Sequence, residues 1–201
     1  MKFYYPLKST RISIDSDLFK RCDLDPNFIL QIKKNGWRIQ IHKEGNDVKF
    51  WTRHKIKMEE LVLDADWKML KTIVQNIKVE SCILDGEFLH RRGKLKNTIY
   101  LWDIFELDGI PVNKPYGERK ALLDSIVLPY NNFFTAKDYV TNFKQIWDNL
   151  EDPEENEGIV LKDTRERLYI DYNKTIKSSK QFKILLETKS DTKYYKTQKV
   201  V

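Results

Sequence analysis

Residues 28–42 read FILQIKKNGWRIQIH, and this stretch decides the fold class. Apolar runs lie on both sides of a short polar turn around Asn35 and Gly36, which predicts strands at residues 28–33 and 37–42. Side chains of a strand alternate between its two faces, so the adjacent Lys33 and Lys34 are expected to point to opposite faces.

Further strands and a few helices are predicted on both sides of this stretch. Strands outnumber helices, and most gaps between them are of hairpin length, which favours an antiparallel α+β fold over a doubly wound one. An acidic segment at residues 151–156 is predicted to be an exposed loop. The other predicted strands are residues 48–52, 82–89, 99–105, 132–135, 158–162, 168–172 and 182–187, and the predicted helices are residues 65–77, 117–126 and 137–150.

Length and composition set limits on the class of protein. The 201 residues, 41% of them hydrophobic, suffice for one domain with its own core. No apolar run approaches the eighteen or so residues that a transmembrane helix needs, and the N-terminus has no apolar signal-peptide segment. The only two cysteines, Cys22 and Cys82, lie far apart, which indicates neither a disulfide framework nor a zinc site. We therefore expect an intracellular protein (in cytoplasm or nucleoid) that does not contact a membrane.

The net charge of +6 is unevenly distributed along the chain. Residues 1–161 contain 25 basic and 25 acidic side chains, whereas residues 162–201 contain 11 basic and 5 acidic ones. A basic C-terminal segment with interleaved tyrosines suits contact with a polyanion, although a solvated lysine-rich tail would have the same composition.

Five short motifs follow one another in a fixed order. Three of the seven glycines (Gly36, Gly86 and Gly158) join a charged pair to the edge of an apolar strand, where a backbone can approach a ligand closely. The motifs are Lys33-Lys34-Asn35-Gly36, Asp85-Gly86-Glu87, Trp102-Asp103, Glu157-Gly158-Ile159-Val160-Leu161-Lys162 and Phe182-Lys183-Ile184.

This succession resembles the signature motifs of the lysine-dependent nucleotidyltransferases, which comprise ATP-dependent DNA ligases, RNA ligases and mRNA-capping guanylyltransferases. A single Lys-x-Asn-Gly arises often by chance, but five elements in the correct order are strong evidence. The linking stretches at residues 36–53 and 101–123 are similar to those of DNA ligases. The resemblance implies antiparallel sheets flanked by helices around a nucleotide cleft, related to the ATP-grasp fold.

The resemblance makes Lys33 the nucleophile that attacks the α-phosphate of ATP to form a lysyl-AMP. Only a neutral lysine can attack, and because its ordinary pKa is about 10.4, nearby cations, a metal or desolvation must lower it. Lys34 is a rival by adjacency alone, but the motif register selects Lys33.

The resemblance also assigns the residues that hold the nucleotide and metal. Trp102 would stack on the adenine, and Gln31 would read the exocyclic amine of the purine. Lys162 and Lys183 would contact the α-phosphate, and Arg53 the phosphates in general. Oxygen ligands suit Mg²⁺, for which Glu157 is the first candidate and Asp85 the second. The implied nucleotide-binding residues are Gln31, Arg38, Arg53, Glu87, Trp102, Lys162 and Lys183.

Three features depart from the family pattern. Asn35 replaces the usual aspartate of the first motif, and Leu185 replaces the second lysine of the last one. About 18 residues follow the last motif, too few for the OB-fold that usually closes the active site. Three alternatives stay open: an excised catalytic domain, a natural minimal ligase, or a degenerate relative; an OB-fold supplied separately is also compatible with the sequence. We predict a nucleotidyltransferase domain at residues 1–190 and a basic tail at residues 191–201.

The predicted function is that of an ATP- and Mg²⁺-dependent DNA ligase domain that seals nicks between a 5′-phosphate and a 3′-hydroxyl in duplex DNA as a monomer. An RNA ligase and a capping guanylyltransferase are the alternatives within the superfamily. A non-catalytic nucleic-acid-binding relative is the alternative from another class. The compact, lysine-rich composition suits a virus or an AT-rich genome.

Overall fold

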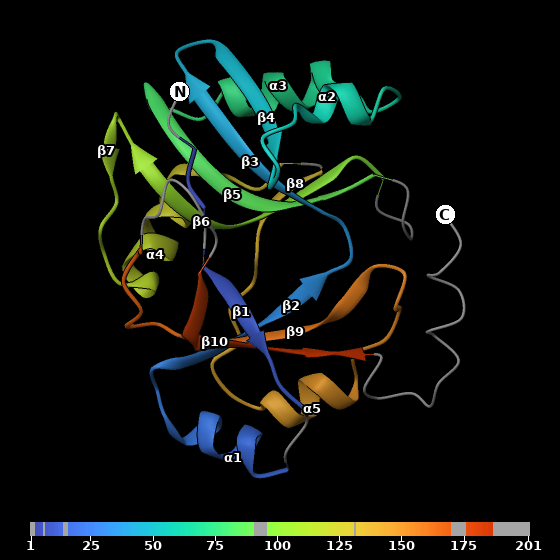
Figure 1. Cartoon of the computed structure of the whole chain (residues 1–201), viewed down its shortest axis with the longest axis vertical. Coiled ribbons are helices and arrows are strands. Elements are labelled where there is room, and N and C mark those ends of the chain that lie inside the picture. The colour runs from blue at the N-terminus through green and yellow to red at the C-terminus, as the bar shows by residue number, and fades with distance from the viewer. Residues whose placement is uncertain are drawn as a thin grey trace.

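Two sheets, stacked one above the other with helices on their outer sides, form the core of the protein in a computed structural model (Figure 1). The structure describes residues 3–5, 7–13, 16–90, 96–130, 132–169 and 176–186. The predicted tail at residues 191–201 lies outside these ranges. None of the described helices is long and apolar enough to cross a membrane.

The smaller sheet has four strands in the order β1 (Lys8–Arg11), β10 (Lys177–Leu185), β9 (Asn156–Asp163) and β2 (Phe28–Lys34). Only the β1–β10 pair is parallel. The helices α1 (Ser16–Leu24) and α5 (Phe143–Asp148) pack on its outer face, at the bottom of Figure 1. The core beneath this sheet contains Phe19, Cys22, Leu30, Phe143, Trp147, Leu150, Ile159, Leu161 and Ile184.

The larger sheet has six strands and contains the segment after the nucleophile motif. Its order is β4 (Asp47–Thr52), β3 (Trp37–Glu44), β5 (Ser81–Leu89), β6 (Thr98–Leu107) and β7 (Ile110–Pro111), with β8 (Phe133–Thr135) parallel to β6. The helices are α2 (Met58–Leu61), α3 (Trp67–Gln75) and α4 (Tyr116–Ile126). Its apolar core includes Ile39, Ile41, Phe50, Leu70, Val74, Leu84, Phe88, Leu101 and Leu123.

The turn at Asn35 and Gly36 connects the two sheets. The strand before it, β2, pairs with β9 of the smaller sheet, and the strand after it, β3, pairs with β4 and β5 of the larger sheet. The chain therefore crosses from one sheet to the other at this point, and the motif residues on both sides of the turn face the space between the sheets.

The α+β class and the antiparallel pairing are confirmed, with local differences. The structure contains β1, α1, α2 and β7, which were not predicted. Residues 168–169 are not in a strand, and residues 170–172 of the same predicted strand lie outside the described ranges. The predicted helix at residues 137–150 is wrong in its first part: Tyr139 pairs with Leu30 by two backbone hydrogen bonds, and Asn142 adopts a left-handed conformation (φ 61°) before α5 begins.

Candidate nucleotide-binding cleft

The inner face of the smaller sheet carries four of the predicted polar site residues. Gln31 and Lys33 are two residues apart on β2, and strand alternation puts both on one face. On β9, Lys162 stands opposite Ile29, and on β10, Lys183 stands opposite Val160. The structure thus brings the predicted nucleophile and both predicted phosphate-binding lysines onto one surface. Leu185 is paired with Gly158.

Lys33 forms an ion pair with Glu157. The β2–β9 register shifts between Lys33 and Lys34, so Glu157 is the extra residue of a β-bulge. Lys34 has different partners: its ammonium donates to Asn156 Oδ1 at 2.9 Å and lies over the Tyr100 ring. The bulge gives Lys33, and not its neighbour, the carboxylate.

Lys183 lies near the Lys33–Glu157 ion pair. Burial, first, and the charge of Lys33, second, lower the pKa of Lys183. Burial also lowers the pKa of Lys162, to about 8, although three aspartates of the cleft oppose the effect. Lys162 and Lys183, both with lowered pKa values, stand on the same face as Lys33, an arrangement that a polyphosphate would neutralise.

The inner face of the larger sheet carries Arg38, Asp85, Glu87 and Trp102. Arg38 donates two hydrogen bonds to Asp85, at 3.1 and 2.6 Å, and the Trp102 indole N–H donates to the same carboxylate at 2.6 Å. The Arg38 guanidinium also lies 5.6 Å from the centre of the Trp102 ring. Burial alone would lower the pKa of Arg38, but the adjacent Asp85 carboxylate holds it above its ordinary value.

The prediction of Asp85 as a metal ligand does not fit this geometry. Asp85 is 1% exposed, and both of its carboxylate oxygens accept hydrogen bonds from Arg38 or Trp102. A carboxylate engaged in this way orients the arginine and the indole. Among the residues that the structure describes, no group of three histidine, cysteine or acidic side chains could hold a metal ion by itself.

Glu87 lies where the two sheets approach each other. It is 5% exposed, and its Oε1 accepts the backbone N–H of Gly36 at 3.1 Å. Burial raises the pKa of Glu87 to about 7, and the charge of Lys33 opposes this rise. A Cβ atom at Gly36 would lie 2.5 Å from the Phe88 carbonyl oxygen, so this close approach requires glycine.

Arg53 lies outside the cluster. It is exposed in the turn after β4, where its Nε donates to His54 Nε2 at 3.0 Å. No hydrogen bond or ion pair joins it to another predicted site residue in the described part of the chain. Asn35, the substituted motif residue, donates to the carbonyl of Pro153 at 3.1 Å, and therefore contacts the predicted acidic loop.

Four residues that the sequence analysis did not select complete the cleft. Arg119, on α4, forms a buried two-bond pair with Asp103, both bonds being 2.8 Å long. The Tyr116 hydroxyl donates to the carbonyl of Trp102 at 3.0 Å. The Lys162 ammonium lies 4.3 Å from the centre of the Tyr116 ring. Asp138 contacts Gln31. Asp103 belongs to the Trp102-Asp103 motif but was given no role, Arg119 and Asp138 lie in predicted helices, and Tyr116 directly precedes one; such positions are too common to select a site residue.

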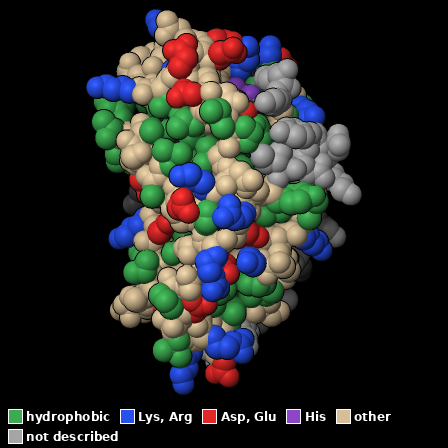
Figure 2. All heavy atoms as spheres, turned by 90° about the vertical axis from the view of Figure 1, so that its left-hand side faces the viewer, with side chains coloured by type: hydrophobic (Ala, Val, Ile, Leu, Met, Phe, Trp, Pro, Cys, Tyr) green, Lys and Arg blue, Asp and Glu red, His purple; other side chains and the backbone are tan. Residues whose placement is uncertain are grey.

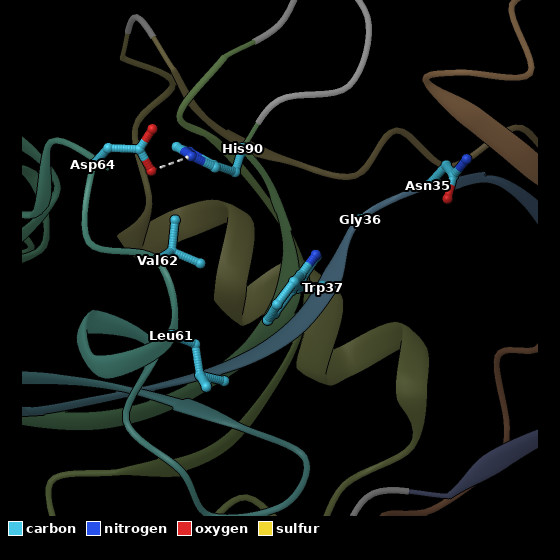
Figure 3. A pocket seen from close by; sticks show the side chains of 7 residues that line it. All are labelled: Asn35, Gly36, Trp37, Leu61, Val62, Asp64 and His90. Carbon is cyan, nitrogen blue, oxygen red and sulfur yellow. Dashed lines mark hydrogen bonds and ion pairs between the residues drawn. The ribbon is translucent and has the colours of Figure 1, made fainter. Parts of the chain in front are cut away.

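A separate pocket of about 240 Å³ adjoins the sheet-crossing turn (Figure 3). Trp37 lies at its centre in that view, and Leu61 and Val62 come from the segment at the end of α2. Asp64 and His90 are joined across its rim at 2.8 Å. Apart from Asn35 and Gly36, its lining shares no residue with the cluster around Lys33, so it neighbours the predicted nucleotide site without being part of it.

Comparison with known proteins points to one family. Residues 7–97 match the family model described as "ATP dependent DNA ligase domain". A DNA ligase of Monkeypox virus is 26% identical over 159 residues, which cover 66% of this chain and 28% of that protein. A putative DNA ligase 4 of Oryza sativa subsp. japonica is 36% identical over 84 residues, 42% of this chain and 6% of that protein. The chain thus spans less than a third of the length of these relatives.

Solved structures share the fold. The ligase domain of LigD from M. tuberculosis superposes with a TM-score of 0.65 at 15% identity, over 90% of this chain and 59% of that one. The ATP-dependent DNA ligase of bacteriophage T7, in complex with ATP, gives 0.54 at 18% identity, over 91% and 69%. An archaeal ATP-dependent RNA ligase gives 0.52 at 17% identity, over 90% and 48%. The family model matches residues 7–97, and the solved structures share the fold, so this chain is similar to the ATP-dependent DNA ligases.

Proposed function

We propose that this chain is the adenylylating domain of an ATP-dependent DNA ligase, with Lys33 as the residue that becomes covalently bound to AMP. The observation that carries the proposal is the position of Lys33: it is paired with Glu157 on a surface that also carries Lys162 and Lys183, and it approaches Glu87 of the other sheet. Relatives named as DNA ligases support DNA, rather than RNA, as the acceptor.

In the first step, Lys33 Nζ forms a P–N bond to the α-phosphate of ATP, and the bond to pyrophosphate breaks. Glu157, already hydrogen-bonded to Nζ, is placed to accept the proton that the ammonium must lose. Lys162 and Lys183 would offset the negative charge that develops on the α-phosphate. Transfer of the AMP to a 5′-phosphate and attack by a 3′-hydroxyl would then close the nick and release AMP.

The nucleotide would lie between the two sheets. Arg38 is fixed by Asp85 beside Trp102, so that one face of the indole is covered by the guanidinium and the other is the candidate surface for the adenine. Glu87 would accept a hydrogen bond from a ribose hydroxyl. Arg53, exposed beyond β4, would need a movement of the turn to reach the phosphates.

Magnesium fits this site with one protein carboxylate. Mg²⁺ usually keeps several waters and binds through one or two carboxylates together with substrate phosphates. Glu157 suits this role, because it is partly exposed beside Lys33, whereas Asp85 is fully engaged. When bound, the ion would neutralise phosphate charge.

Basic side chains on the surface support a polyanionic partner. Figure 2 shows Lys and Arg side chains, with a few acidic ones among them, along the middle and lower parts of one face. Nicked duplex DNA would be bound by such charges largely through its phosphates. A separate OB-fold domain and a monomeric state remain part of the proposal.

The experiment that tests the proposal is intact-mass measurement after incubation with ATP and Mg²⁺. We expect a gain of one AMP, its loss in Lys33→Ala, and its retention in Lys34→Ala, because Lys34 bonds to Asn156 instead of Glu157. Addition of GMP from GTP would support capping instead. If neither nucleotide is added, sealing of pre-adenylylated nicked DNA would separate a need for an OB-fold from an inactive site, and nicked RNA in parallel would test the acceptor.

A further inference from the structure

The amide of Gln31 has both of its N–H groups engaged inside the cleft. Its Nε2 donates to the Tyr116 hydroxyl at 2.8 Å and to Asp138 Oδ1 at 2.5 Å, and the residue is only 3% exposed. An amide has two donor hydrogens and one carbonyl oxygen, so these two bonds use its whole donor capacity. Oε1 is left without a hydrogen bond from any residue that the structure describes.

The chemistry of the neighbours fixes which end of the amide is which. The Tyr116 hydroxyl donates its single proton to the carbonyl of Trp102, which can only accept, so toward Gln31 the hydroxyl oxygen must accept. Burial raises the pKa of Tyr116 well above its ordinary value, which keeps that proton in place. A turned amide would set its oxygen against the lone pairs of the Tyr116 oxygen.

The contact with Asp138 independently indicates the same orientation of the Gln31 amide. An ionised carboxylate accepts hydrogen bonds and donates none. Burial raises the pKa of Asp138, and the bond from Gln31, followed by the charges of Lys120 and Lys162, opposes that rise. Two acceptors from different parts of the chain, Tyr116 in α4 and Asp138 before α5, therefore hold one orientation of the amide.

The remaining oxygen belongs to the residue that the resemblance assigns to the purine base. Gln31 is two residues from Lys33 on the same face of β2, about 6.6 Å along a strand, and the Trp102 carbonyl that ends the hydrogen-bond chain belongs to the proposed stacking residue.

We propose that Tyr116 and Asp138 are specificity-determining positioning residues, which hold Gln31 Oε1 as an acceptor for the 6-amino group of adenine. A 6-oxo purine would set its own oxygen against Oε1 and leave two acceptors facing each other. The inference rests on the proposed function, because it names how that same site selects ATP over GTP.

The test is the ratio of the adenylylation rate with ATP to the corresponding rate with inosine triphosphate, which carries the 6-oxo group but lacks the 2-amino group of guanine. For the unaltered chain we expect ATP to be favoured by about tenfold to a hundredfold, the usual effect of an unmatched buried polar group. Asp138→Asn should lower this ratio several-fold, because an asparagine can donate as well as accept and permits Gln31 to turn. Asp47→Asn, whose side chain is 57% exposed, should leave it unchanged.

A ratio has the advantage that partial unfolding lowers both rates equally. Should Asp138→Asn fail to fold, Tyr116→Phe, which removes only the hydroxyl, should show the same fall. An unchanged ratio in a folded variant that still reacts with ATP would overturn the inference and leave the proposed function intact. If the unaltered chain forms no adduct, sealing of pre-adenylylated nicked DNA decides the proposed function, and equilibrium binding of ATP and inosine triphosphate decides the inference: equal affinities would overturn it.

Discussion

At the scale of single residues, Glu87 should give the chain a measurable pH dependence. Its pKa rises from 4.5 to about 7 on folding, chiefly through burial, so between these values the folded state binds a proton that the unfolded state has lost. The contribution of Glu87 to stability therefore falls as pH rises from about 4.5 to 7. The difference in unfolding free energy between Glu87→Gln and the unaltered chain should therefore shift by about 3 kcal/mol in favour of the variant from pH 4 to pH 8. Urea unfolding of both chains at the two pH values measures this shift.

A matched control separates this effect from general changes in charge. Glu118→Gln removes an acid that is 57% exposed and that pairs, among the described residues, with Lys114 four positions earlier, so the unfolding free energy of that variant should follow the unaltered chain at every pH. Parallel pH profiles for Glu87→Gln and the unaltered chain would contradict the buried position of Glu87. The same variant should form less of the AMP adduct, because Oε1 already accepts the Gly36 N–H and only a carboxylate has a second oxygen that can accept from the ribose hydroxyl.

Residues that belong to short ordered motifs could be selected from the sequence, and isolated residues could not. Lys33, Glu157, Lys162 and Lys183 come from such motifs, and the structure brings them onto neighbouring strands. Tyr116 and Asp138 occupy no motif, and they reach Gln31 only because the chain returns to it from 85 and 107 residues away. The engagement of Asp85 by Arg38 and Trp102 likewise depends on strand register, which composition does not specify.

At the scale of elements, β9 depends on a glycine in its bulge. Gly158 has φ +152°, and a Cβ atom there would lie 2.1 Å from the carbonyl oxygen of Ile184 on β10. Gly158→Ala must therefore separate β9 from β10 or distort the bulge that presents Glu157, at an expected cost of at least about 3 kcal/mol. Chemical unfolding of Gly158→Ala and of the unaltered chain measures this loss of unfolding free energy.

The comparison for this prediction is Gly109→Ala. Gly109 also has a positive φ, of 77°, but nothing lies within 4 Å of its Cβ position. The substitution should cost only the backbone strain, about 1–2 kcal/mol. Equal losses for both glycines would show that β9 and β10 can move apart without penalty, and that the bulge does not fix Glu157.

Elements with a strong apolar period were predictable, and those defined by long-range pairing were not. The apolar face of α3 was visible in the sequence, and the structure buries Leu70, Ile73 and Val74 there. Residues 137–142 have polar and apolar residues in a helical order, but Tyr139 instead extends the edge of β2. In this short segment, pairing with β2 outweighed the helical pattern of the sequence.

At the scale of the whole molecule, the sequence predicted a class but not the division into two sheets. The apolar runs before and after Asn35 look like the two arms of a hairpin, yet β2 and β3 belong to different sheets. Alternation shows which residues share a face of one strand, but it does not show which strands become neighbours. The contacts between the sheets, such as the hydrogen bond from the Gly36 N–H to Glu87, arise from that division.

The whole chain should bind nicked DNA partly through residues 187–201, which contain four lysines and two acids. A chain ending at residue 186 retains every described site residue, so the AMP adduct should form as before. Its affinity for a nicked duplex should depend less on salt: the slope of log K against log salt should fall by up to about 3.6, at roughly 0.9 for each lost phosphate contact. A tail of the same composition in scrambled order should restore the slope, because phosphate contacts read charge and not sequence. An unchanged slope after truncation would assign DNA binding to the basic face of the folded domain alone.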